Sequence, residues 1–483
     1  MDRSHLYKHA TDTVEQLRFR IQKKQTDLRR EKRKKILSLK RLRYGENLNG
    51  DESVLSTVED VILMTRRLFE HNTQRLEILR KLKNIFAQGD TVSDAFLSQN
   101  GAIEVLVKHL TGKEVQLQVE AAWCLTNLAA STHKHAVQIA KICGAYLITY
   151  LQSSNVILQD LCAWTVGNLA GDCEECRCIM IDQGAVHSLV KLLKVIVIFS
   201  TFHNVVHSAV FALNNLTRGN NKNVFDEMIR YNTGHILLGL VKNCARSDEV
   251  LVELATLVMY FTTNQIGVEH ITSCGITVTF LIESIARFGL VDNCVHIATP
   301  FIRALGNMCA ISNQLCDEAA KDNVIFKVMP TLLTSNIYHI KKESLWLLSN
   351  VTAGSTSSIK SFVEINLLDV VLAMLDESFD IPKEAAMVLL NISCRTPEYL
   401  QQITKSGGLH KFVILTKRGD NDLCLLALQF VELVLRRLNN GQEMFESMGG
   451  VEVLDNLYYS GNEEISRCAN DLMKVYFELE QSS

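Results

Sequence analysis

The sequence has 483 residues, of which 47% are hydrophobic and 7% aromatic, and its 4 prolines all lie at or beyond position 300. Proline breaks helices more strongly than any other residue, so the composition permits long helices packed through aliphatic side chains. The most apolar run, residues 195–202, is far shorter than the roughly 20 apolar residues that a membrane-spanning helix needs. Composition therefore excludes a membrane span at this segment.

Charge is distributed unevenly along the chain. Residues 1–50 contain 15 Lys and Arg against 6 Asp and Glu, a local balance of +9, whereas the remaining residues carry −12. The pattern predicts a basic helix over 14–43 within a basic segment at 1–43, followed by a linker at 44–56 that is rich in Gly, Asn and acidic residues. Such an arm suits nucleic acid, an anionic membrane, an acidic partner or the acidic body of the same chain.

From residue 57 onward one pattern recurs, in which a turn of small residues precedes an apolar helix. These turns are predicted at Gly101, Gly144, Gly184, Gly275, Gly407 and Gly449. A second landmark follows at Asn127, Asn168, Asn215, Tyr260, Asn307, Asn350 and Asn391, with spacings of 41 to 47 residues. HEAT and armadillo repeats have this period of about 40 to 47 residues, with two or three helices each. The sequence therefore predicts an all-α fold, a right-handed superhelical solenoid of about ten armadillo repeats over 57–483 with an extended concave groove.

Each of the three tryptophans is followed four residues later by an asparagine. The pairs are Trp123/Asn127, Trp164/Asn168 and Trp346/Asn350, and Phe211/Asn215 keeps the spacing with a different ring. Residues i and i+4 share one face of a helix, so stacked repeats would alternate amides with aromatic slots. Amides can clamp the main chain of a peptide, and indole faces can hold the stem of a Lys or Arg. The phased pairs predict an extended basic ligand, although a single Trp on an apolar helix is more often a core residue.

These motifs resemble the importin alpha (karyopherin alpha) family, the adaptors that carry cargo bearing nuclear localisation signals. The similar stretches are 120–129, 164–172, 215–219, 342–354 and 449–477. The chain departs from the family at Phe211, Thr256 and Met387, where the family has Trp, and at Ser131 and Ala136, where it commonly has Gly and Thr. It is also similar to divergent importin-alpha-like paralogues of the transmembrane and coiled-coil domain-containing protein type.

The resemblance implies two peptide sites. The implied major site comprises Trp123, Asn127, Trp164, Asn168, Asp172, Phe211 and Asn215, with Asp172 neutralising the principal lysine of the signal. The implied minor site comprises Arg303, Asn307, Trp346, Asn350, Glu384 and Asn391. Glu253 and Glu343 fall where the family also tends to place acids.

The basic segment at 1–43 resembles the family's importin-beta-binding segment. The implied receptor-binding and autoinhibitory residues are Arg29, Arg30, Lys32, Arg33, Lys40, Arg41 and Arg43. The resemblance thus implies an importin-beta-type receptor, cargo proteins with lysine- or arginine-rich signals, and a location in cytoplasm and nucleus. A solvated tail is the plainer alternative for the arm. Direct nucleic-acid binding is disfavoured because no aromatic stacking platform accompanies the charge. An armadillo scaffold with a different partner and an RNA-binding helical array remain the alternative functions.

Catalytic signatures are absent from the sequence: it has no phosphate loop, nucleophile elbow, zincin motif or dinucleotide fingerprint. We therefore predict neither enzyme activity nor a cofactor. Cys173, Cys176 and Cys178 form a Cys-x-x-Cys-x-Cys cluster, but no second Cys/His pair follows at a spacing suited to zinc, so no metal is predicted. His133 and His135 are expected in a loop rather than as ligands. The remaining cysteines are scattered through apolar patterns, which is typical of reduced intracellular thiols.

Overall fold

The computed structural model describes residues 57–477, apart from 71–72, 200–202, 220, 244–247, 292–293, 322, 355–358, 361 and 364–366. The basic segment, the linker and all seven receptor-binding residues predicted within the arm lie outside these residues. Helix is the only regular secondary structure among the residues described. The all-α prediction is confirmed.

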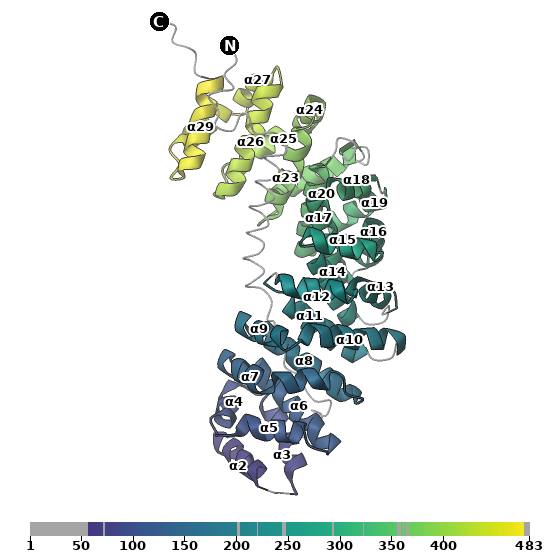
Figure 1. Ribbon diagram of the computed structural model, residues 1–483. Helices are drawn as coiled ribbons and strands as arrows, with labels where there is room; N and C mark the ends of the chain where they lie inside the picture. The colour runs from purple at the N-terminus through teal and green to yellow at the C-terminus, as the bar shows by residue number, and fades with distance from the viewer. Residues whose placement is uncertain are drawn as a thin grey trace. The chain divides into compact units, whose positions relative to one another are not determined.

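The chain divides into two compact units, which meet in sequence between residues 276 and 277. The first contains α2 (Val58–Phe69), α3 (Arg75–Ile85), α4 (Asp90–Leu97), α5 (Ala102–Leu110), α6 (Val115–Ala130), α7 (His133–Tyr150), α8 (Val156–Asp172), α9 (Glu174–Asp182), α10 (Ala185–Phe199), α11 (His203–Leu216), α12 (Lys222–Arg230), α13 (Thr233–Asn243), α14 (Asp248–Phe261) and α15 (Gln265–Ser273). The second contains α16 (Val278–Gly289), α17 (Val295–Ile311), α18 (Asn313–Lys321), α19 (Asn323–Thr334), α20 (Tyr338–Thr352), α22 (Leu367–Ala373), the 3-10 helix η3 (Met374–Asp376), α23 (Ile381–Ser393), α24 (Pro397–Lys405), α25 (Gly408–Leu415), α26 (Asn421–Arg437), α27 (Gly441–Ser447), α28 (Gly450–Tyr458) and α29 (Glu463–Tyr476) (Figure 1).

Within each unit, one helix of every repeat packs on the equivalent helix of the next repeat. We call these the stacking helices: α3, α6, α8, α11 and α14 in the first unit, and α17, α20, α23, α26 and α29 in the second. Asn127 lies on α6 and Asn168 on α8, and the later landmarks follow one to a helix from α11 to α23. The recurring interval of 41 to 47 residues is therefore the repeat period of a helical solenoid, as the sequence predicted.

Local sequence explains where the helices begin. Thr57 and Asp60 form a capping box, in which the Asp60 amide donates to the Thr57 hydroxyl and the Thr57 amide donates to the Asp60 carboxylate. The side chain of Asn155 likewise accepts the amides of the first turn of α8. Glycine makes the turn into a following helix where the backbone is left-handed, a conformation that other residues rarely adopt. This confirms the turns at Gly101, Gly184, Gly275, Gly407 and Gly449, whose φ angles lie between +69° and +98°.

The turn predicted at Gly144 is wrong, because α7 runs without a break from His133 to Tyr150. A Cβ at Gly144 would lie 2.3 Å from Gln183 Oε1 and 2.5 Å from Met180 Cε. Glycine at this position lets the ends of the Gln183 and Met180 side chains approach the backbone of α7 closely. The loop expected at His133 and His135 is also wrong, since both residues lie in the first turn of α7.

The core follows the stacking helices. In α8 every residue from Leu158 to Gly171 except Gln159 is buried, because α6 and α11 pack on it together with α7 and α9. Burial raises the pKa of the Cys143 thiol to about 12 and that of the Cys424 thiol to about 11, so both thiols pack as apolar groups. In the described part of the chain no single helix is long and apolar enough to cross a membrane. The helices α15 and α16, which form a bent pair, reach that length and apolar composition only when they are counted together.

Candidate functional site

The asparagines of the stacking helices share one contact. Five of them donate a side-chain N–H to a backbone carbonyl of the preceding stacking helix, at the residue just before the equivalent asparagine of that helix. The bonds are Asn127 to Lys83 (2.8 Å), Asn168 to Thr126 (3.2 Å), Asn215 to Gly167 (2.9 Å), Asn350 to Gly306 (3.1 Å) and Asn391 to Ser349 (2.7 Å). An amide has a second N–H and a carbonyl oxygen, so one side chain can tie two repeats together and also clamp a ligand.

Two aromatic positions fit against glycines of the preceding stacking helix. A Cβ on Gly306 would lie 2.3 Å from Cζ3 of Trp346, and one on Gly167 would lie 2.5 Å from Cδ1 of Phe211. Trp346 is 8% exposed and Phe211 is 2% exposed. These rings therefore pack between repeats, which is the core role that a single Trp suggests, in addition to any role toward a ligand.

We expect Gly306→Ala to destabilise the second unit. An added Cβ would lie 2.3 Å from the rigid indole of Trp346, so crowding costs about 2 to 3 kcal/mol. The helix propensity of Ala returns about 1 kcal/mol, which leaves a net loss of about 1 to 2 kcal/mol. Urea unfolding and tryptophan fluorescence measure the loss and the shift of the ring. Gly461→Ala is the control, because no atom lies within 4 Å of its added Cβ. Equal stability of the two variants would show that the indole is not held against Gly306.

In the first unit, the chain places one of its own cations on an indole. The Lys83 ammonium lies 4.3 Å from the ring centroid of Trp123, which is partly exposed, and 2.7 Å from Glu120 Oε2. Arg80 also pairs with Glu120, at 3.1 Å. A cation between an indole face and a carboxylate is the arrangement that the sequence predicted for a ligand lysine, so this part of α6 can accommodate such a group.

The next two stacking helices carry the other aromatic residues of the predicted major site. Trp164 on α8 lies with its ring centroid 5.3 Å from that of Phe211 on α11, and 5.6 Å from His207 on the same helix. Glu253 on α14 is buried and accepts a hydrogen bond from Asn214 at 2.7 Å. The structure therefore brings Trp164 and Phe211 together, one repeat beyond Trp123.

Asp172 is the last residue of α8, and its side chain is only 5% exposed. Its Oδ2 lies 2.5 Å from Nδ1 of His133, the first residue of α7. Ser131, where the family commonly has a residue that assists this carboxylate, bonds instead to Asp90 at 2.7 Å. Asp172 thus stands at a junction of helix ends, in hydrogen-bond contact with the imidazole of His133.

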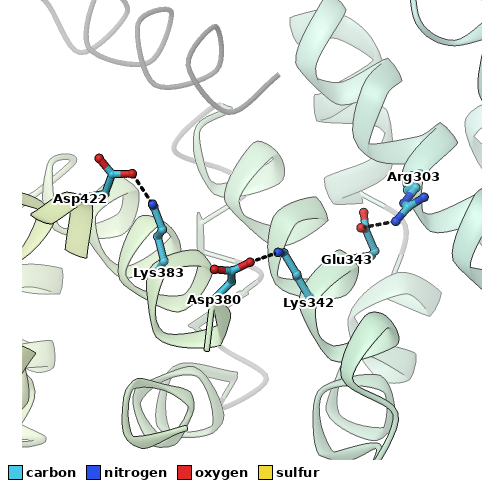
Figure 2. Close-up of polar contacts among 6 residues, drawn as sticks. All are labelled: Arg303, Lys342, Glu343, Asp380, Lys383 and Asp422. Atoms are coloured by element: carbon cyan, nitrogen blue, oxygen red, sulfur yellow. Dashed lines mark hydrogen bonds and ion pairs between the residues drawn. The ribbon is translucent and has the colours of Figure 1, made fainter. Parts of the chain in front are cut away.

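A series of ion pairs crosses the stacking helices of the second unit (Figure 2). In each pair a base of one repeat meets an acid of the next, 38 to 40 residues later. The pairs are Arg303 with Glu343 (2.6 Å), Lys342 with Asp380, and Lys383 with Asp422 (2.5 Å). Of the three bases, Arg303 was predicted from the sequence, whereas Lys342 and Lys383 were not. The separation of opposite charges by one repeat is a signal that could have found them.

The pKa of Lys342 is raised by its acidic neighbours. Burial lowers the pKa of Lys342, but the hydrogen bond to Asp380 and the charges of Asp380 and Glu384 outweigh it, so the pKa stands above its ordinary value. Glu384 of the predicted minor site and Glu343, where the family also tends to place an acid, thus face bases of the chain itself. A basic ligand in the second unit would meet like charges beside each acid.

Comparisons with known proteins agree with this geometry. Importin subunit alpha-9 of Arabidopsis thaliana is 28% identical over 84% of this chain and 80% of its own length, and importin subunit alpha-2 of Oryza sativa subsp. japonica is 27% identical over 84% and 78%. An engineered protein solved by crystallography matches 86% of this chain and 98% of its own, with a TM-score of 0.76 and 24% identity. The likeness to importin alpha subunits inferred from the Trp/Asn motifs is confirmed, and so is the armadillo-repeat solenoid.

A match to a protein-family model fits the predicted similarity to divergent importin-alpha-like paralogues. A family model described as TMCO6 matches residues 60–477, which is most of the sequence. The chain belongs to the TMCO6 family.

Proposed function

We propose that this protein is a nuclear import adaptor, which binds basic nuclear localisation signals across α6, α8 and α11 and an importin-beta-type receptor through residues 1–43. The ring and amide series on consecutive stacking helices is the observation that carries the proposal. It places Trp123, Trp164 and Phe211 one repeat apart, each with its asparagine one turn further along the helix. The likeness to importin alpha subunits supports it.

The first unit suits a basic peptide better than the second. On α6 the Lys83 ammonium shows that the Trp123 face tolerates a cation beside a carboxylate. Bases of the chain neutralise acids in both units, since Lys83 and Arg80 pair with Glu120 and Lys342 pairs with Asp380. We place the main site for a lysine-rich peptide in the first unit because its consecutive stacking helices carry three of the four ring and amide pairs.

The test is a binding titration of residues 57–483 against a simple lysine-rich signal peptide, followed by Asn127→Ala and Asn168→Ala. Each variant is expected to lose about 0.5 to 1.5 kcal/mol of binding free energy, because an amide clamp on the peptide main chain is removed. Each also loses its bond to the preceding repeat, so unfolding must be measured alongside.

Asn214→Ala is the matched control. Asn214 is buried and bonds to the next repeat through Glu253, but it is not a predicted peptide clamp. It should lower stability and leave peptide affinity unchanged. Unaltered affinity in folded Asn127→Ala and Asn168→Ala would exclude the assignment of the major site.

The second candidate function, an armadillo scaffold for a different partner, is favoured by the cations of the second unit. Arg303, Lys342 and Lys383 give its stacking helices a row of bases one repeat apart. A partner with acidic side chains at matching intervals would pair with these bases in place of the chain's own acids. Tighter binding of an acidic peptide than of a lysine-rich one would select this function.

A further inference from the structure

Three different metal-binding side chains meet where α7, α8 and α9 come together. His133 is the first residue of α7, Asp172 is the last residue of α8, and Cys173 is the N-cap of α9. Their donor atoms, one each from imidazole, carboxylate and thiol, all lie within 4.8 Å of one another. In sequence the histidine is 39 residues from the aspartate, so the repeat stacking alone brings the three together.

We propose that His133, Asp172 and Cys173 bind a thiophilic divalent cation, with Zn²⁺ as the ion whose ligand preferences fit best. Zinc binds imidazole nitrogen, carboxylate oxygen and thiolate sulfur, commonly in tetrahedral geometry. A thiolate ligand disfavours Mg²⁺ and Ca²⁺, which prefer oxygen donors alone. Three protein ligands leave a fourth position for water or for a group of a partner.

The arrangement allows an ion to enter with little rearrangement. The His133 side chain is 64% exposed at a helix end, so its ring can reorient, while Asp172 is held at 5% exposure. On binding, the ion replaces the hydrogen bond between His133 Nδ1 and Asp172 Oδ2, and the thiol proton of Cys173 passes to solvent. The resulting carboxylate and thiolate balance the two positive charges of the ion.

Of the neighbouring cysteines only Cys173 belongs to the cluster. Cys176 is buried and its backbone amide donates to Cys173 Sγ at 3.3 Å, whereas Cys178 is exposed on α9. The predicted Cys-x-x-Cys-x-Cys motif is therefore not itself the site. The ligand set comes from one cysteine of that motif and from two residues of other helices.

One consequence rests on the proposed function. Asp172 is the residue assigned to the principal lysine of a basic signal, and a divalent ion at its carboxylate would repel the ammonium group. Ion and peptide should therefore exclude each other. At a free Zn²⁺ concentration about 100 times its dissociation constant, competition would lower the apparent peptide affinity about 100-fold.

The direct test uses the full chain, reduced and stripped of metal, titrated with Co²⁺ without peptide. One equivalent should produce the absorption of a cobalt thiolate, which Zn²⁺ then bleaches. Cys173→Ser should abolish this band while its hydroxyl preserves the N-cap of α9. His133→Ala should weaken Co²⁺ binding more than about 10-fold, since even losing a residue that only supports a ligand costs that much.

Cys178→Ser is the control, and its titration should match that of the unaltered chain. Absence of the band, or a band that persists in Cys173→Ser, overturns the proposed metal site.

Peptide binding is measured separately, in the presence of a metal chelator. If no basic peptide binds in chelator, the peptide function fails while the cobalt result still decides the metal site. If peptide binds and Zn²⁺ does not weaken it, the competition is wrong.

Discussion

Asp172→Lys is expected to lower the affinity for a lysine-rich peptide by about 100-fold or more. The Asp172 side chain is 5% exposed, so its charge acts in a poorly screened environment. The substitution replaces an attraction by a repulsion, and like charges in contact cost several kcal/mol. Fluorescence anisotropy in chelator, with a panel of peptides in which each lysine is replaced in turn, measures the effect. The unaltered chain should favour lysine strongly at one position, and the variant should lose that preference.

Two further variants make this result specific. Asp182→Lys changes the net charge equally from an exposed place at the end of α9, and should alter affinity by less than about 3-fold because water and salt screen it. Asp172→Asn keeps the size of the side chain and should show an intermediate loss. If Asp172→Lys weakens binding equally at every peptide position, or not at all, Asp172 has a capping role at the end of α8 and does not bind a ligand lysine.

Deleting residues 1–50 is expected to tighten binding of the same peptide by about 10- to 100-fold. The arm carries +9, and Lys40-Arg41-Leu42-Arg43 itself resembles a basic signal. The predicted linker at 44–56 tethers this segment at a local concentration in the millimolar range, so an intrinsic dissociation constant of about 10 to 100 μM would keep the peptide site about 90 to 99% occupied. An importin-beta-type receptor should reproduce the gain in the full chain by capturing residues 14–43, because such coupling is reciprocal.

Titrations at low and moderate salt separate the two sources of this effect. Long-range attraction between arm and body fades as salt rises, whereas close contacts at the site are screened less. The receptor should have no effect on the truncated chain, which serves as its own control once circular dichroism shows that it is folded. Equal affinities of full and truncated chains at both salt concentrations would rule out self-inhibition.

The repeat architecture could be predicted from sequence because the asparagines of five repeats make the same bond to the preceding repeat. Asn127 and Asn168 mark the period since both bond to the preceding stacking helix, a requirement that any stacked repeat shares. Gly144 misled the prediction because glycine serves two needs, a left-handed turn or a close approach, and the local sequence does not distinguish them. Only the position of Gln183 and Met180 decides for close approach.

Contacts between repeats were harder to predict than features within one. His133 was predicted in a loop, yet it starts α7 and contacts Asp172 of the next repeat. Aligning the repeats would have placed the end of α6 beside the end of α8, and His133 near Cys173. The same alignment would have paired Lys342 with Asp380, which local pattern analysis does not reveal.

The three ion pairs between stacking helices give this part of the second unit a direction, since in each the base comes from the earlier repeat and the acid from the later one. Lys411 and Asp376, which lie off the stacking helices, pair in the opposite order. A fragment cut after α23 would end in Lys383 without Asp422, and a fragment beginning at α20 would start with Glu343 without Arg303. Opposite charges would thus lie at opposite cut ends. Proteolytic fragments of this unit would therefore carry complementary charges at their two ends and could associate head to tail. Head-to-tail contacts between copies produce open filaments when the geometry does not close them into a ring.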